Sequence, residues 1–291
     1  MKFGVKLIDI NNIEQFTEIV ATVSRLCSKG SCGKTCIIKL NKDSICFVLP
    51  EFASNQLLPD NPGRVSFWMK IDALLLFDFY IFEGKSAEKS TIMIEILPEN
   101  LYHVLKSSPN VKNIKLKLAN KQSICLSIEI EYCGISMKSK SRTVSHDIPV
   151  KIISSSFLAI KDFQEPNLTN SSLSIQLPCL KTLKHMIERM KAMGDFINIE
   201  ATKKGDLTLK IQTDCVSVSC FFKNLPVQVQ NNECNSYSLR LSIKRMSEFI
   251  NGLHIKPDKI ICNFVKNKYA HFLVIHNENM VLHYLISSIL D

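Results

Sequence analysis

Apolar and polar residues alternate with a period of two over most of the chain, which predicts β-strands of five to nine residues. Short polar turns such as Ala119-Asn120-Lys121-Gln122 join neighbouring strands. Such turns are typical of antiparallel hairpins, so we expect antiparallel sheets and not β-α-β units. The clearest strand segments are 115–119, 124–132, 172–177, 206–212, 216–222, 237–242, 259–265 and 271–275.

Four segments repeat their apolar residues with the period of a helix, at residues 12–28, from Pro98 onwards, at 179–193 and at 243–252. Pro98 is favourable in a first helical turn, and Ser242 suits the N-cap position of the last helix. We therefore predict four amphipathic helices.

The order of elements is the same in the two halves of the chain. A strand, a helix, several strands, a second helix and three more strands fill residues 1–154, and the order begins again at residue 172. Between them the alternation is lost and Ser, Asn and Pro166 accumulate, which is typical of a linker. We predict an α+β fold with two similar domains, residues 1–154 and 172–291, joined by an inter-domain connector at 155–171.

The 291 residues carry a formal charge of +9, with +5 in residues 1–145 and +4 in the remainder. This even excess suits either a protein that lies near a polyanion without gripping it or simply a basic soluble protein. The chain contains no apolar run of the roughly 18 residues that cross a bilayer. Its alternating N-terminus does not resemble a secretion signal. These features argue against membrane and exported classes.

The eleven cysteines predict neither disulfides nor a metal site. Their number is odd, and in a reducing compartment cysteine behaves as a small apolar side chain. Cys27, Cys32 and Cys36 are the closest group, but they form no Cys-x-x-Cys pair and have no nearby histidine. We expect no metal and no cofactor.

Two segments look catalytic and fail on geometry. Gly30–Thr35 resembles a phosphate-binding loop, but Ser28 replaces its first glycine, and the segment follows a helix instead of a strand. Ser145-His146-Asp147 looks like a triad, yet successive residues of a strand point to opposite faces. No other catalytic motif occurs, so we favour a protein that is not an enzyme.

The predicted helices expose more basic than acidic side chains. For any one helix, an ordinary solvated face is the simpler explanation, but a basic outer face shared by four helices favours a surface for a polyanion. In the first helix Glu14 and Glu18 precede Arg25 and Lys29, a distribution that also follows the helix dipole. In the second helix His103 and Lys106 outnumber the single acid Glu99, and in the fourth Lys244 and Arg245 outnumber Glu248. The third helix has one acid, Glu188, and five basic residues: Lys181, Lys184, His185, Arg189 and Lys191.

Short segments along the whole chain resemble, in order, the Hus subunit of the eukaryotic nine-one-one checkpoint clamp. No single segment is diagnostic, but their collinear sum is specific. They include Met1-Lys2-Phe3, Val65-Ser66-Phe67-Trp68, Phe82-Glu83-Gly84-Lys85, Ile114-Lys115-Leu116-Lys117-Leu118, His146-Asp147-Ile148-Pro149, Gln164-Glu165-Pro166, Leu180-Lys181-Thr182-Leu183-Lys184, Ile187-Glu188-Arg189-Met190-Lys191, Phe222-Lys223-Asn224-Leu225 and Leu282-His283-Tyr284.

The resemblance implies a sliding-clamp fold, similar to that of the replication clamp, with sheets outside and four helices lining a central hole. It further implies one third of a 1:1:1 heterotrimeric ring in the nucleus, placed on double-stranded DNA by a clamp loader. There the ring would recruit checkpoint and repair proteins. By the same analogy, ring contacts would use strand edges near residues 112–119 and 236–242.

Such a ring must slide, so its inner charges should meet phosphates loosely and without base contacts. We predict the DNA-facing residues Arg25, Lys29, Lys106, Lys181, Lys184, Arg189, Lys191, Lys244 and Arg245. In clamps the connector borders a pocket for client peptides. The apolar connector residues therefore either bind clients or, more simply, form local core: Phe157, Leu158, Ile160 and Phe163. Two alternatives stay open: a homotrimeric polymerase clamp, and an α+β enzyme or ligand-binding protein with an unrecognised site.

Overall fold

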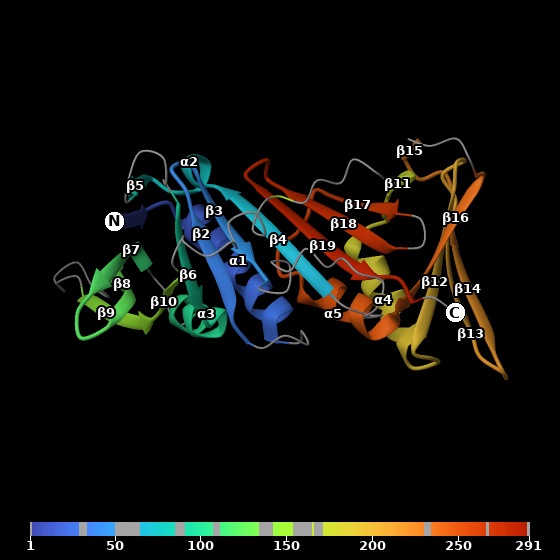
Figure 1. Cartoon of the computed structure of the whole chain (residues 1–291), viewed down its shortest axis with the longest axis horizontal. Helices are drawn as coiled ribbons and strands as arrows, with labels where there is room; N and C mark the ends of the chain where they lie inside the picture. Colours follow the sequence, from blue (N-terminus) through green and yellow to red (C-terminus); the bar gives the residue numbers. More distant parts are fainter. Residues whose placement is uncertain are drawn as a thin grey trace. The chain divides into compact units, whose positions relative to one another are not determined.

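The computed structural model describes residues 2–28, 34–49, 65–84, 91–106, 111–133, 142–153, 165, 171–229, 234–265 and 268–289. These residues form two compact units (Figure 1). The first draws on Met1–Ala53 and Met69–Gln164, and the second on Ser54–Trp68 and Glu165–Asp291.

The first unit packs its helices against antiparallel sheets. One sheet has the order β5-β1-β7-β8-β9, and the strands β10-β6-β2-β3 form a second antiparallel array. Its helices are α1 (Ile10–Ser28), α2 (Ala73–Leu76) and α3 (Pro98–Lys106). Its strands are β1 (Lys2–Leu7), β2 (Cys36–Leu40), β3 (Ser44–Val48), β5 (Phe79–Glu83), β6 (Ile92–Ile96), β7 (Val111–Asn120), β8 (Ile124–Tyr132), β9 (Arg142–Pro149) and β10 (Lys151–Ile153). Strand β4 (Val65–Asp72) divides between the units after Trp68.

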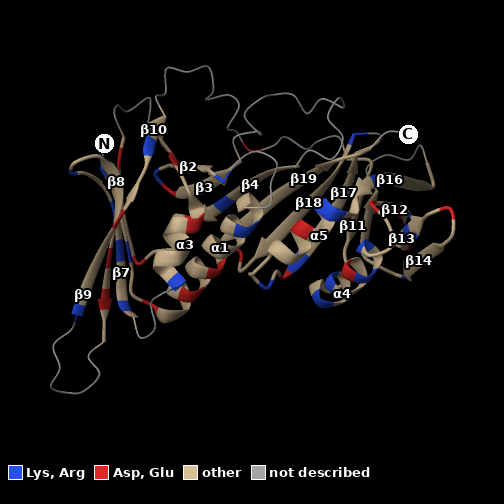
Figure 2. Ribbon diagram, turned by 90° about the horizontal axis from the view of Figure 1, so that it is seen from below, with Lys and Arg blue, Asp and Glu red and all other residues tan. Residues whose placement is uncertain are grey.

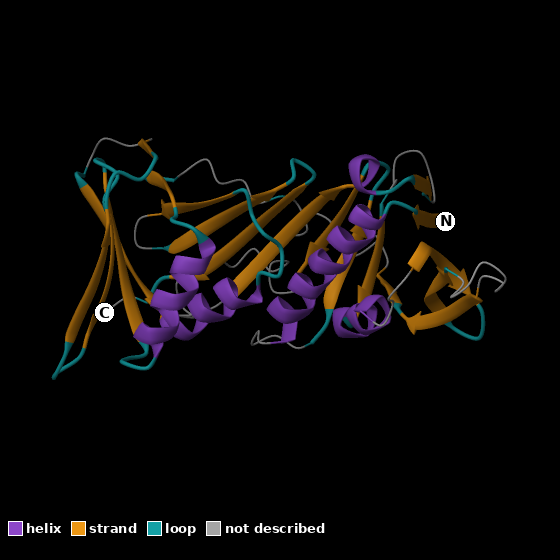
Figure 3. Ribbon diagram, turned by 180° about the vertical axis from the view of Figure 1, so that it is seen from behind, coloured by secondary structure: helices purple, strands orange, loops and turns teal. Residues whose placement is uncertain are grey.

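The second unit repeats this plan. A four-stranded sheet has the order β14-β13-β12-β16, and the strands β19-β18-β17-β11-β15 form a second array. The helices are α4 (Leu180–Lys191) and α5 (Ile243–Gly252). The strands are β11 (Leu173–Gln176), β12 (Phe196–Thr202), β13 (Leu207–Gln212), β14 (Ser217–Phe222), β15 (Val227–Val229), β16 (Ser236–Ser242), β17 (Lys259–Val265), β18 (Tyr269–His276) and β19 (Met280–Ser287). In each unit the helices cover one face of the strands (Figure 3).

The predicted α+β class and the repeated element order are confirmed. Each unit runs from a strand through a helix, several strands and a second long helix to further strands. The four predicted helices are α1, α3, α4 and α5, and the segments 124–132 and 259–265 coincide with β8 and β17. Helix α2 was not predicted, because four residues are too few to display a helical period.

Aromatic rings occupy the core of each unit. In the first, the Phe16 ring of α1 meets the Phe77 ring edge-on at 5.4 Å between centroids. In the second, the Phe249 ring of α5 stacks on Tyr284 at 4.4 Å. The contact of Phe16 holds the apolar face of α1 against the end of α2, and that of Phe249 holds α5 against β19, which leaves the opposite faces for solvent or a ligand.

The prediction of a sheet edge near residues 112–119 is wrong. These residues belong to β7, which pairs with β1 on one side and β8 on the other. The lysines of β7 are exposed because one face of the sheet is solvated, and a solvated face produces the same alternation as an edge strand. The edges of this sheet are β5 and β9, whereas β16, at residues 236–242, is an edge of its own sheet.

Candidate nucleic-acid interface

Helix α4 has one apolar and one basic face. Leu183, Ile187 and Met190 are buried and lie three or four residues apart, so they form one stripe against the sheet. Lys181 and Arg189 are exposed on the remaining surface. Helix α4 contains four lysines and arginines and one acid, so its net charge is +3. Figure 2 shows that basic residues predominate along this helix.

The single acid of α4 is turned towards α5. Ser247 Oγ donates a hydrogen bond of 2.6 Å to Glu188 Oε1, and Asn251 Nδ2 donates to the same oxygen. Lys191 Nζ of α4 in turn donates to Ser247 Oγ at 3.2 Å. This cluster fixes the two helices side by side, and exposed Lys244 lies on α5 three residues before Ser247.

Besides Lys191, which donates to Ser247, two more predicted DNA-facing residues make intramolecular contacts. Lys184 is half-buried, and its Nζ donates to the Leu253 carbonyl oxygen at 3.3 Å; burial lowers the pKa of this amine. Arg245 forms a 2.9 Å ion pair with Glu248 on its own helix, and the two side chains are only 18% and 13% exposed. Their charges are therefore partly compensated before any ligand arrives.

The helices of the first unit are less basic. Arg25 of α1 and Lys106 of α3 are exposed, and Lys106 Nζ lies 5.7 Å from the centroid of the Tyr102 ring. Exposed Glu14 and Glu18 give α1 a net charge of −1. Lys29 lies outside the described residues. Among the described helices, the exposed basic residues that we predicted to face DNA are therefore concentrated on α4 and α5.

The connector residues predicted to border a client pocket, Phe157, Leu158, Ile160 and Phe163, lie outside the described residues. Glu165 is described, and its Oε1 lies 3.6 Å from Nε2 of His283 in the second unit. His283 also meets His271, with 3.2 Å between His271 Nε2 and His283 Nδ1. Burial lowers the pKa of both imidazoles, that of His271 to about 3.

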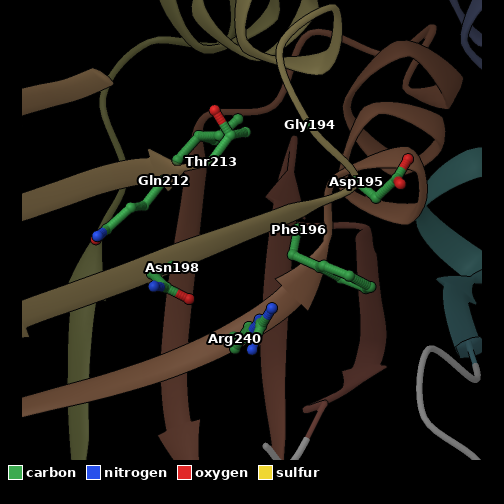
Figure 4. A pocket seen from close by; sticks show the side chains of 8 residues that line it. Gly194, Asp195, Phe196, Asn198, Gln212, Thr213 and Arg240 are labelled. Atoms are coloured by element: carbon green, nitrogen blue, oxygen red, sulfur yellow. The ribbon is translucent and has the colours of Figure 1, made fainter. Parts of the chain in front are cut away.

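A separate pocket of about 440 Å³ lies at one end of the β12–β13–β16 surface (Figure 4). Asn198, Gln212 and Arg240 line it, and the Arg240 guanidinium stacks 4.8 Å from the centroid of the Phe196 ring. None of the predicted DNA-facing residues lines this pocket. It is a polar feature of the sheet that sequence reasoning did not find, since its members come from three strands.

Of the two segments that looked catalytic, residues 30–33 of the first lie outside the described residues, and the second lies along a single strand. Ser145, His146 and Asp147 are consecutive on β9, and Asp147 pairs with Lys121. Within the described ranges, no group of three His, Cys, Asp or Glu side chains is placed to hold a metal ion. Among the same residues, no helix is long and apolar enough to cross a membrane.

The prediction that the cysteines are buried apolar side chains holds for half of those described, whereas Cys133, Cys179 and Cys215 are exposed. Ten of them are described, and all ten are free thiols. Cys27, Cys36, Cys46, Cys125 and Cys262 are buried among apolar side chains, where burial raises the pKa of the Cys262 thiol. Cys32 lies outside the described residues.

The arrangement of two α+β units, each with paired helices on one face of its sheets, is that of a sliding clamp. The chain superposes on proliferating cellular nuclear antigen from Entamoeba histolytica with a TM-score of 0.69 and 15% identity, over 99% of both chains. The same protein from Thermococcus kodakaraensis gives a TM-score of 0.69 and 15% identity, over 99% of this chain and 100% of that one. These likenesses establish the fold.

The particular family follows from the sequence. The family model for Hus1-like protein matches residues 1–290. The chain is 35% identical to human checkpoint protein HUS1 over 297 residues, which cover 99% of this chain and 100% of that protein. It is 25% identical to checkpoint protein hus1 of Schizosaccharomyces pombe over 218 residues, 74% of this chain and 68% of that protein. The chain belongs to the Hus1-like family and is a checkpoint clamp subunit.

Proposed function

We propose that this subunit joins two other checkpoint-clamp subunits in a 1:1:1 ring that encircles double-stranded DNA, and that it acts as a scaffold without an enzymatic activity or cofactor of its own. A clamp loader would place the ring at damaged or recessed DNA ends in the nucleus, where it would recruit checkpoint and repair proteins. The observation that carries the proposal is the exposed basic face of α4 and α5.

The chemistry of that face suits sliding. Lys181, Arg189 and Lys244 are exposed cations on long, flexible side chains, and the contacts of such groups with phosphates carry no sequence information. Helix α4 presents no Phe, Tyr or Trp on which a base could stack. The face therefore favours loose contact with a duplex backbone over a grip on single strands.

Ring closure would use sheet edges. Strand β9 pairs only with β8, and β14 pairs only with β13, among the described residues. Each leaves one row of backbone groups for a neighbouring strand. We place the contacts with the two partner subunits at these edges, one on each unit, which lets every subunit meet two neighbours.

The first experiment is light scattering of the purified chain, alone and mixed with the two partner subunits. We expect a monomer that enters a stable 1:1:1 trimer. A trimer formed by the chain alone would support the homotrimeric polymerase clamp instead. A chain that stays monomeric and ignores both partners would overturn the ring.

The second experiment tests encirclement. The ring is loaded on nicked circular DNA and then challenged by cutting the circle. Topological binding predicts retention on the circle and release within seconds to minutes after cutting. The triple variant K181E/R189E/K244E should reduce loading, whereas the matched variant K204E/K256E/K259E, in which the exposed lysines lie off the helices, should load normally. Equal loss in both variants would refute a specific role for α4 and α5.

A further inference from the structure

The edge strand β14 carries the most exposed large apolar side chain among the described residues. Phe221 is 69% exposed, and the residue opposite it on β13 is the polar Thr208. Ser217, Ser219 and Phe221 alternate with half-buried residues, so they share the solvated face of the strand. A single exposed apolar side chain is ordinary on a surface. This one, however, lies on a strand whose outer row of backbone groups has no partner strand in the described part of the chain.

The opposite face of β14 does not discriminate between neighbouring strands. Val218 and Phe222 are half-buried on that face and continue the core of the sheet. The edge strand β9 has a similar core face, with half-buried Val144 and His146 and buried Ile148. A strand that joins either edge would extend the core over these residues. The choice of neighbour therefore depends on the solvated faces of the two edges.

The solvated face of β9 is polar where β14 would meet it. Thr143, Ser145 and Asp147 are exposed on this face, and Asp147 forms a 2.7 Å ion pair with Lys121. Pro149 ends the strand. In a ring made only of this chain, β9 of one copy would have to pair with β14 of the next.

The lengths of the two strands limit how such a pair can align. Strand β14 has six residues and β9 has eight, so three antiparallel alignments use the whole of β14. A shift of one residue exchanges the two faces, so one of the three would join the solvated face to the core face. The other two alignments place Phe221 opposite Thr143 or Ser145. A second copy of this chain therefore offers Phe221 a hydroxyl side chain in either alignment.

We propose that the strand that joins β14 belongs to a partner subunit and presents an apolar side chain opposite Phe221, and that the polar face of β9 excludes a second copy of this chain from that position. An aromatic ring paired across strands with an apolar side chain stabilises a sheet. Opposite Thr143 or Ser145, the same ring would cover a hydroxyl without giving it a hydrogen-bond partner. The inference rests on the proposed ring and adds the chemistry that selects one neighbour against another.

The first test measures the affinity of each partner subunit, taken separately, for the full chain and for Phe221→Ser. One partner should bind the variant at least about tenfold more weakly, because aromatic anchors contribute much of the energy of an interface. The other partner, which joins β9, should bind it like the parent. Leu74→Ser is the matched control, since Leu74 is 68% exposed on α2 of the other unit. Both partners should bind this control within about twofold of the parent chain.

The second test creates the neighbour that the sequence lacks. The variant T143V/S145V gives β9 an apolar solvated face, and we expect it to self-associate in light scattering as its concentration rises, whereas the parent chain stays monomeric. Adding Phe221→Ser to the same chain should abolish this self-association. That result distinguishes pairing of β9 with β14 from aggregation through the valines alone. A T143V/S145V chain that stays monomeric, or a triple variant that still self-associates, would overturn the proposed exclusion.

The outcomes separate this inference from the proposed function. If the parent chain binds neither partner, the ring itself fails. If the parent forms the ring and Phe221→Ser binds both partners equally well, only the inference fails. It also fails if Phe221→Ser assembles normally but the ring no longer retains a client protein, because Phe221 would then contact clients. Thermal melting checks the fold of each variant, and Phe221→Thr, with a side chain that favours strands, supplies a second substitution.

Discussion

Ser247 of α5 donates a hydrogen bond of 2.6 Å to Glu188 of α4, and so joins the two helices through the one acid that α4 carries. A carboxylate in the middle of a basic helix would otherwise weaken its positive field. Here it is directed sideways, where Asn251 shares the same oxygen. The polar cluster therefore serves the geometry of the basic face, since it fixes the separation of the two helices that present it.

Ser247→Ala should lower the free energy of unfolding by about 0.5–1.5 kcal/mol, because it removes the hydroxyl that both the Glu188 carboxylate and Lys191 contact. Urea denaturation measures the change. Ser219→Ala, on the exposed face of β14, is the control and should change stability by less than about 0.5 kcal/mol. Similar losses for the two variants would contradict a structural role for the cluster.

The predicted DNA-facing residues should divide into two groups when each is neutralised. K181Q/R189Q removes exposed cations and should reduce the salt dependence of duplex binding by the assembled ring. The slope should fall by up to roughly 0.9 for each phosphate that the ring no longer neutralises. R245Q should instead lower the melting temperature, because it strands the mostly buried Glu248 carboxylate.

Binding of a fluorescent duplex at several salt concentrations, together with thermal melts, checks both expectations. K204Q, in the β12–β13 turn, is the matched control for charge. If R245Q changes the salt dependence as much as K181Q/R189Q and melts like the parent chain, the ion pair with Glu248 does not hold Arg245 away from the duplex.

The helices were predictable because their apolar residues repeat strongly. Leu183, Ile187 and Met190 fall on one face by spacing alone, and all three are buried. The period also places Lys184 towards the basic side. The helical period does not predict that the Lys184 amine donates a hydrogen bond to the carbonyl oxygen of Leu253, which lies 69 residues further along the chain. Such pairings depend on how α4 and α5 pack, which no local pattern encodes.

The outward position of Leu74 and Leu75 on α2 escaped prediction for a related reason. Leu74-Leu75-Leu76 reads as a short apolar run, and such runs ordinarily mark a buried strand. The Asp72 cap converts the run into one helical turn with Leu76 inwards and its neighbours outwards. The edges of the sheets could not be predicted either. Alternation identifies β7 as a strand, but it does not show which strands pair with it.

Stability should fall as the pH is lowered from 7 to 5. Burial and the neighbouring His283 lower the pKa of His271 to about 3, well below the value of about 6.5 for an unfolded histidine. Between these values the unfolded chain binds a proton that the native chain does not. The contribution of His271 is therefore fully present above pH 6.5 and is lost as the pH falls, by at most about 1.4 kcal/mol per pH unit.

Urea denaturation at pH 7, 6 and 5 measures this slope. His271→Gln should flatten it, because the glutamine side chain does not titrate. His185→Gln, at an exposed position on α4, is the control for the substitution itself. The same flattening in both variants would show that the slope does not arise in the buried pair of His271 and His283.

Two glycines should respond in opposite ways to alanine. Gly205 has a φ of +86°, where an L side chain is strained, and a Cβ there would collide with the Leu225 carbonyl oxygen. The Gly205 carbonyl also accepts the Leu225 N–H at 2.8 Å, which closes the turn between β12 and β13 onto the segment after β14. Gly205→Ala should therefore cost about 2 kcal/mol or more of unfolding free energy.

Gly4→Ala provides the matched control within β1. A Cβ at this position would meet only the Leu116 carbonyl oxygen, at an ordinary contact distance of 3.8 Å. Alanine also restricts the unfolded chain more than glycine does, so the substitution should be neutral or stabilising by up to about 1 kcal/mol. Denaturation midpoints of the two variants test the pair. A Gly205→Ala protein as stable as the parent would mean that the turn can rearrange, and that the Leu225 contact does not fix the β12–β13 hairpin.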